Sequence, residues 1–412
     1  MFLCTAAAIA AAACLNPEMV RGQEFYLHNG DRVAFYGDSI TAQRFYTRDI
    51  QDFAETRYPA LDAAWHNAGV PGDKATGGFA GDAGVRVSRD VEPWHPTVIT
   101  VMLGMNDGDY MAPDPTVFAA YQSAYEKLLS LLRTAAPGAR ITLIENTPYD
   151  EITHGTEFAG YEATTEQNAR ATPALGRREN LAVIDDCDPV KDLLERAKAT
   201  DPSLAALLVP DRIHPSEPLH WIMAEAVMRA WHVDPVVTSV AISGSQGAVV
   251  RSQRTRVTAV ARHGGVLMWD QLDDALPLPL NFDNPLMEFV LRISDLADWD
   301  QETLQVTDLR PGRYILAIDG KNVGTFADGE LSQGINLALR KTPMWDQARD
   351  YDGELEKRSH LEDAALILSA EMHAPANPAA VEGLRAGESE SEQDAENQLR
   401  NAAHHYRLSP AP

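Results

Sequence analysis

Short apolar runs alternate with amphipathic segments over the first half of the chain. The spacing of apolar positions between the runs predicts helices over 42–57, 115–134, 163–178, 190–199 and 217–231. The runs themselves, several of them rich in β-branched residues, are the predicted strands: 32–36, 64–68, 98–103, 141–145 and 181–184. Strands that alternate with helices in this way predict βαβ units, and therefore an α/β fold around a parallel sheet.

The third of these runs indicates how the sheet is buried. Residues 98–103 read Val-Ile-Thr-Val-Met-Leu, which is almost continuously apolar. A strand with this composition is covered on both faces, as in a sheet with helices on either side. Five such strands suit a flavodoxin-like three-layer sandwich with a five-stranded parallel sheet.

The pattern changes after Val233-Asp234-Pro235. Residues 236–343 contain strand-like runs such as 304–306 and 313–318, and the turn 319–322 leads into another at 323–326, so a small antiparallel β unit is expected. The remainder, 344–412, is predicted to be a C-terminal helical segment and tail. It has an amphipathic helix over 344–372, and 384–400 is either a solvated helix or a disordered tail.

The beginning of the chain, residues 1–23, has the character of an export segment. Its apolar run, Ala6–Ala13, is too short to cross a bilayer. The sequence therefore predicts a protein exported to the periplasm or the outside of the cell, with its first domain over 24–235. A disordered or helical N-terminus of a cytosolic protein is the alternative. No transmembrane run is found.

The charge balance excludes one class of partner. Lys and Arg total 35 against 60 Asp and Glu, a net charge of −25. An acidic surface repels phosphate backbones, so nucleic acid is not an expected partner. The sequence does not indicate whether the protein is a monomer or an oligomer.

Polar, turn-forming motifs follow the predicted strands. They are Gly37-Asp38-Ser39 after the first strand, 67–73 after the second, 104–107 after the third, and 211–215 before the last helix. Active sites of open α/β sheets lie at the carboxyl ends of the strands, so all four motifs are expected at one edge of one sheet.

With these motifs in this order, the chain resembles the SGNH/GDSL hydrolase superfamily, which comprises serine esterases and acylhydrolases of flavodoxin-like fold. The resemblance covers the domain over 24–235 and does not extend beyond it. It implies Ser39 as nucleophile, Gly72 and Asn106 as oxyanion-hole residues, and Asp211 and His214 as acid and base. The one departure is Ile40, where the family has leucine.

The chemistry of these residue types supports the same roles. The hydroxyl of Ser39 is a weak nucleophile that needs a base, and a neutral imidazole such as that of His214 can accept its proton. A carboxylate three residues earlier, Asp211, would fix the tautomer of the imidazole. The backbone N–H groups of Ser39 and Gly72 and the amide of Asn106 would stabilise the oxyanion. This chemistry needs no cofactor and no metal.

Each of these residues has a simpler structural interpretation when it is taken alone. Ser39 could cap the helix that follows, and Gly72 and Asn106 could be turn residues. Asp211 and His214 could be a surface pair at the start of the last helix. Only their combination, each after a successive strand, favours catalysis.

The sequence therefore predicts a serine esterase that acts through an acyl-enzyme, and the expected reaction is O-deacetylation of a carbohydrate. The expected partner is a small-molecule or polysaccharide ester. One alternative is a lysophospholipase or thioesterase, in which Met105, Phe79 and Trp221 line an acyl pocket. Another is a non-catalytic module that binds carbohydrate or protein on an esterase fold.

Overall fold

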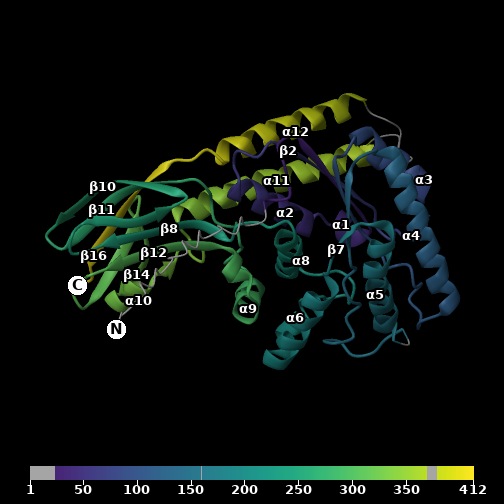
Figure 1. The fold of residues 1–412 in the computed structure, drawn as a ribbon, viewed down its shortest axis with the longest axis horizontal. Coiled ribbons are helices and arrows are strands. Elements are labelled where there is room, and N and C mark those ends of the chain that lie inside the picture. The colour runs from purple at the N-terminus through teal and green to yellow at the C-terminus, as the bar shows by residue number, and fades with distance from the viewer. Residues whose placement is uncertain (1–23, 159, 369–377) are drawn as a thin grey trace, which may run out of the picture.

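The N-terminal half of the chain is built on a five-stranded parallel sheet, in the order β2-β1-β5-β6-β7 (Figure 1). The computed structural model describes residues 24–158, 160–368 and 378–412, so the predicted export segment, residues 1–23, lies outside the described residues. The strands are β1 (Asp31–Gly37), β2 (Ala63–Gly69), β5 (Val98–Met102), β6 (Arg140–Ile144) and β7 (Ala182–Ile184). The predicted α/β fold with a parallel sheet is confirmed.

Helices cover both faces of this sheet. Val33 and Phe35 of β1 pack in one core with helices α2, α6 and α8, whereas Tyr36 points to the other face and packs in a second core with α4 and α5. Because side chains of β1 point alternately to the two faces, the sheet is the middle layer between two layers of helices. The helices are α1 (Ser39–Ala42), α2 (Phe45–Arg57), α3 (Ala83–Arg86), α4 (Pro115–Ala135), α5 (Tyr161–Glu179), α6 (Cys187–Thr200), α7 (Pro202–Ala205) and α8 (Glu217–Ala230).

The first predicted helix, 42–57, is observed as α2, which begins three residues later than predicted and is preceded by the separate short helix α1. Arg44 lies between α1 and α2 with φ of 67°, and a left-handed residue interrupts a right-handed helix. Two carboxylates far along the chain hold the Arg44 guanidinium: Glu362 at 2.6 Å and Asp363 at 2.9 Å. Sequence periodicity could not predict this break, because the ion pair at Arg44 is made with residues more than 300 positions later in the chain.

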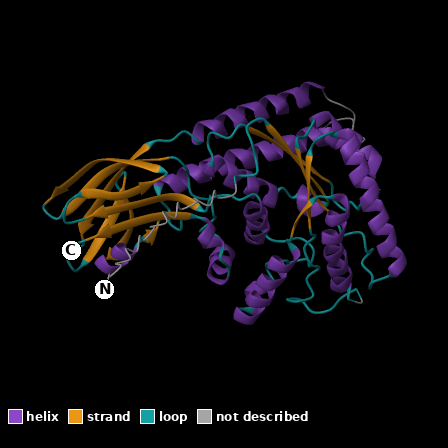
Figure 2. Cartoon of the chain, in the orientation of Figure 1, coloured by secondary structure: helices purple, strands orange, loops and turns teal. Residues whose placement is uncertain are grey.

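The C-terminal half contains two further sheets, which pack face to face (Figure 2). One is antiparallel, in the order β10-β11-β16-β13-β14; the other, β15-β12-β8-β9, contains one parallel pair, β8 with β12. The elements are β8 (Val236–Ser243), β9 (Ala248–Gln253), β10 (Thr255–His263), β11 (Val266–Asp273), α9 (Pro285–Ile293), β12 (Gln301–Thr307), β13 (Arg313–Ile318), β14 (Lys321–Ala327), α10 (Asp328–Gln333) and β15 (Ile335–Asn336).

The tail predicted at the C-terminus is a strand. Residues Ala403–Pro410 form β16, which lies between β11 and β13 in the antiparallel sheet. Only Tyr406 and Leu408 of this segment are buried in the core, and most of its other residues are polar. This prediction was wrong because the strand's partners lie about a hundred residues earlier, and two apolar positions are too few to reveal a strand.

Two long helices connect the β unit with the α/β domain, as Figure 1 shows. They are α11 (Pro343–Leu368) and α12 (Pro378–Gln398). Residues 384–398 are thus helical, as one of the two alternatives predicted, and Ser391 of α12 donates a hydrogen bond to the Glu354 carbonyl of α11 at 2.7 Å. No helix within the described ranges is long and apolar enough to cross a membrane.

Candidate active site

Ser39 is the first residue of α1, directly after the turn that ends β1. The helix is capped by its neighbour: the Asp38 carboxylate accepts a hydrogen bond from the Ile40 N–H at 3.0 Å. The turn is tight, since a Cβ on Gly37 would lie 2.1 Å from the Thr41 hydroxyl. Because Asp38 satisfies the helix start, the Ser39 hydroxyl is free for another partner.

That partner is His214. The imidazole Nε2 lies 2.8 Å from Ser39 Oγ, and Nδ1 lies 2.6 Å from the Asp211 carboxylate. The second oxygen of Asp211 accepts the backbone N–H groups of Ile213 and His214, at 3.0 and 2.8 Å, so a local turn sets the geometry of the pair. Ser39, His214 and Asp211 therefore form one continuous chain of hydrogen bonds.

The loop that carries the pair is anchored from outside. Arg212, between Asp211 and His214, has φ of 70°, and its guanidinium donates to the Gly155 carbonyl at 2.6 Å and pairs with Glu157 at 2.6 Å. The site remains open to solvent, because the side chains of His214 and Asp211 are 28% and 53% exposed.

Electrostatics keep Asp211 ionised. Partial burial acts to raise the pKa of this carboxyl, but the hydrogen bonds from the His214 side chain and from two backbone N–H groups outweigh it. The net result is a pKa below the ordinary value. Asp211 therefore remains an acceptor for the imidazole well into the acid range.

The two remaining predicted residues lie in the loops after β2 and β5. Gly72 is exposed, with φ of +72° and open space where a side chain would stand, so its backbone is accessible to a ligand. Asn106 is buried, and its amide nitrogen donates to the Asp73 carbonyl at 3.0 Å and approaches Asp38 Oδ2 at 3.4 Å. Its oxygen accepts from the Tyr110 hydroxyl at 3.1 Å, which fixes which way the amide faces.

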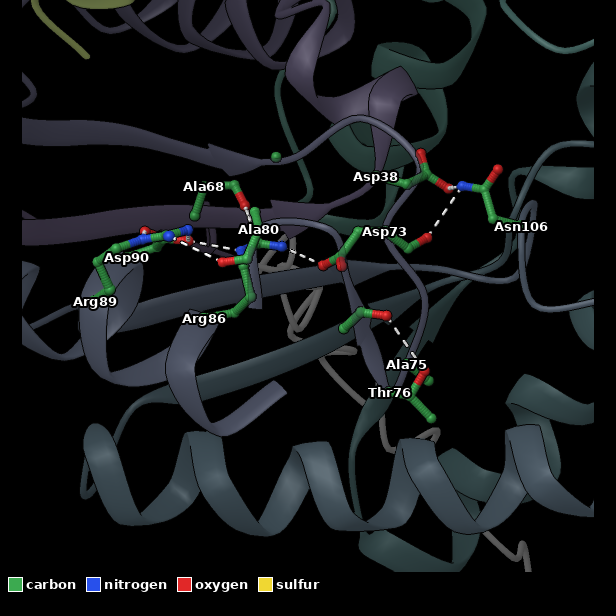
Figure 3. A network of polar contacts seen from close by, with 12 residues as sticks. Asp38, Ala68, Asp73, Ala75, Thr76, Ala80, Arg86, Arg89, Asp90 and Asn106 are labelled. Carbon is green, nitrogen blue, oxygen red and sulfur yellow. Dashed lines mark hydrogen bonds and ion pairs between the residues drawn. The ribbon is translucent and has the colours of Figure 1, made fainter. Parts of the chain in front are cut away.

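A buried arginine that the sequence analysis did not single out supports the Gly72 loop. Arg86 of α3 is fully buried and contacts the Asp73 carboxylate, the Ala68 carbonyl and, at 2.6 Å, Asp90 (Figure 3). Figure 3 shows that this network continues through Asp73 to Asn106 and Asp38. Tyr110 was missed as well. The one available signal was the four-residue spacing of Arg86 and Asp90, which suits an ion pair on a helix.

Three buried carboxyl groups adjoin Asn106. Burial raises the pKa of Asp38 to about 7, that of Asp107 to about 7 and that of Asp73 to about 6. Near neutral pH, part of this negative charge is therefore removed by protonation, which limits its repulsion of an oxyanion. Within the described ranges, no group of three or more His, Cys, Asp or Glu side chains is arranged to hold a metal ion.

A parallel α/β sheet with a Ser–His–Asp hydrogen-bonded chain at its carboxyl edge is the arrangement of a serine hydrolase. Residues 35–222, a little under half of the chain, match the GDSL-like Lipase/Acylhydrolase family, and this domain is a GDSL-like hydrolase domain. It is an esterase or acylhydrolase, a carboxylic ester hydrolase of the SGNH type.

Two similar proteins extend the comparison. An acetylxylan esterase of Geobacillus stearothermophilus is 26% identical over 219 residues, which are 49% of this chain and 94% of the relative. The solved structure of BT4096, a gut microbial diltiazem-metabolizing enzyme, has a TM-score of 0.78 at 22% identity and covers 93% of this chain and 98% of its own. The fold therefore matches over nearly the whole chain, including the C-terminal half.

Proposed function

We propose that this protein is a serine esterase that removes O-acetyl groups from a carbohydrate through an acyl-enzyme on Ser39. The observation that carries the proposal is the hydrogen-bonded chain from Ser39 through His214 to Asp211. The similarity to an acetylxylan esterase supports the acetylated carbohydrate as substrate. The apolar run near the N-terminus supports export, which would bring the enzyme to polysaccharide.

The first half of the reaction is acylation. Ser39 Oγ attacks the ester carbonyl carbon while its proton passes to His214 Nε2, and Asp211 stabilises the imidazolium. The carbonyl oxygen becomes an oxyanion, stabilised by the N–H groups of Ser39 and Gly72 and by Asn106. The carbon–oxygen bond to the alcohol then breaks, the alcohol oxygen takes the proton from His214, and the acyl group remains on Ser39.

The second half reverses these proton transfers with water. His214 takes a proton from water as the water oxygen attacks the acyl carbon. The bond from this carbon to Ser39 Oγ then breaks, Oγ takes the proton back from His214, and the acid is released. The Asn106 amide has two hydrogens, and its longer contact, 3.4 Å to Asp38, is the weaker one. The hydrogen on that side is the one proposed to be donated to the oxyanion.

The alternative of an acyl-chain hydrolase loses part of its support. Of the residues suggested for an acyl pocket, Met105 is fully buried and Trp221 is 3% exposed, and both pack in the main core. Phe79 alone is exposed.

The substrate class is tested by a series of nitrophenyl esters of increasing acyl length, run beside acetylated xylan, pectin and glucomannan. Release of acetate from a polymer, together with a preference for nitrophenyl acetate over longer acyl esters, is expected. Faster turnover of long-chain esters without acetate release would replace this proposal with the acyl-chain hydrolase.

Hydrolysis should fall on the acid side of neutrality, because an imidazole base loses activity when it is protonated. The pKa of Asp211 is held below its ordinary value, so this carboxylate stays charged on the acid side of neutrality. The acid limb of log(kcat/KM) for p-nitrophenyl acetate, measured from about pH 4 to about pH 8, should therefore fall as the pH is lowered. A flat profile would count against His214 as the base.

Tyr110→Phe should lower kcat about three- to tenfold with little change in KM, because the hydrogen bond that orients the Asn106 amide is lost. The matched control is Tyr149→Phe. Tyr149 belongs to the same aromatic cluster, with its ring 5.3 Å from that of Tyr161, to which Tyr110 also stacks. Equal losses of kcat in the two variants would mean that the cluster, and not the hydroxyl on Asn106, matters.

A further inference from the structure

A cavity of about 360 Å³ lies between the end of β2 and the segment 79–94. Its walls are mostly apolar and include Val70, Pro71, Phe79, Ala80, Pro93 and Trp94. The cavity therefore offers a surface for apolar or amphipathic groups rather than for ions.

The cavity adjoins the loop that carries Gly72, a proposed oxyanion donor; we call it the oxyanion loop. Pro71 in its wall directly precedes Gly72, and the N–H of Val70 donates to the Gly37 carbonyl at 3.0 Å, two residues before Ser39. On the other side, Phe79 and Ala80 form the tip of the hairpin of β3 (Gly77–Gly78) and β4 (Gly81–Asp82). A Cβ on Gly78 would lie 3.3 Å from the Gly72 carbonyl oxygen, so this hairpin packs directly on the oxyanion loop.

The charged groups around the cavity are paired with one another. Arg89 binds the Asp90 carboxylate at 2.6 Å and the Ala80 carbonyl at 3.0 Å, which also fixes the tip of the hairpin (Figure 3). The Asp90 carbonyl lies 2.9 Å from the His66 imidazole. With its charges satisfied internally, the cavity favours an uncharged occupant.

Phe79 gives the cavity a recognition element. Its side chain is 75% exposed, although exposing an aromatic ring to water is unfavourable. An exposed aromatic ring beside a catalytic loop is well placed to pack against the ring of a ligand.

We propose that this cavity binds an uncharged ring in the alcohol portion of the ester: the apolar face of a sugar, or an aryl group. The inference rests on the proposed function, because an acetyl group is far too small to fill 360 Å³ and leaves the alcohol as the part that can occupy the space. Phe79 and Ala80 are then determinants of specificity, with no part in the bond-making steps.

The test varies the alcohol while the acyl group stays acetyl. Ala80→Trp fills the cavity and should lower kcat/KM about tenfold for p-nitrophenyl acetate and for acetylated xylo-oligosaccharide, while methyl acetate changes less than about twofold. Phe79→Ala, at an exposed position that does not threaten folding, should lower the same two values several-fold. Val250→Trp, at a 67% exposed position of β9, is the control for the added indole.

An unchanged ratio of kcat/KM between the ring-bearing acetates and methyl acetate in both variants would overturn the proposal. So would an effect confined to a series of p-nitrophenyl esters of increasing acyl length, which would assign the cavity to the acyl group. Failure of the proposed function looks different, because methyl acetate and p-nitrophenyl acetate would then be hydrolysed by the Ser39→Ala variant as well.

Discussion

Ser39→Ala is expected to lower kcat for p-nitrophenyl acetate by a factor of about a thousand or more while the protein remains folded. The hydroxyl is the group that His214 contacts at 2.8 Å, and no other nucleophile is expected to form the acyl-enzyme. The side chain is only half-buried, and the helix is capped by Asp38 rather than by Ser39. Removing the hydroxyl should therefore cost little stability. Initial rates and the circular dichroism spectrum measure the two effects.

Ser216→Ala is the matched control. Ser216 lies two residues after His214, and its hydroxyl finds no hydrogen-bond partner among the described residues. The control should keep its rate within about twofold of the original. Retention of more than a small fraction of the rate in Ser39→Ala would refute the assignment of the nucleophile, and a large loss in both variants would point to damage to the loop.

Arg86→Leu is expected to lower the free energy of unfolding by about 3–5 kcal/mol and to reduce activity strongly in the protein that remains folded. The substitution leaves the buried Asp73 carboxylate without its cation and removes the donor to the Ala68 carbonyl. Asp73 follows Gly72 directly, and its carbonyl holds Asn106. A shift of Asp73 therefore disturbs Gly72 and Asn106, the two proposed oxyanion donors, together.

The loss of stability should depend on pH. Burial already raises the folded-state pKa of Asp73 to about 6, although Arg86 opposes it, and removal of Arg86 raises this pKa further. When a carboxyl pKa is higher in the folded protein than in the unfolded chain, the free energy of unfolding falls as the pH rises from the unfolded-state pKa towards the folded-state pKa. Urea unfolding should therefore show a larger deficit at about pH 8 than at about pH 5.

Two further variants test this explanation. Arg86→Leu combined with Asp73→Asn should recover part of the stability, because the uncompensated charge is gone. Arg170→Leu removes the same side chain from an exposed pair with Asp188, whose side chains are 59% and 41% exposed, and should cost no more than about 1 kcal/mol. If Arg86→Leu costs no more than Arg170→Leu, the buried network does not stabilise the loop.

The sequence determined the α/β domain because the evidence for it is local. The five strands were predicted as short runs and the segments between them follow a helical period. Polar motifs come after the first three strands and just before the last helix. The rule that parallel strands share one carboxyl edge then predicted that Ser39 and His214, which are 175 residues apart, would meet. In the structure, His214 Nε2 lies 2.8 Å from Ser39 Oγ, in agreement with that rule.

Contacts between distant segments decided the rest. β16 exists because β11 and β13 flank it, and Arg44 separates α1 from α2 where carboxylates of α11 reach it. The roles of Arg86 and Tyr110 follow only from their contacts, Arg86 with Asp73 and Tyr110 with Asn106. Periodicity records which face of one element is buried, whereas ion pairs, cavities and the orientation of an amide depend on which other elements lie against that face.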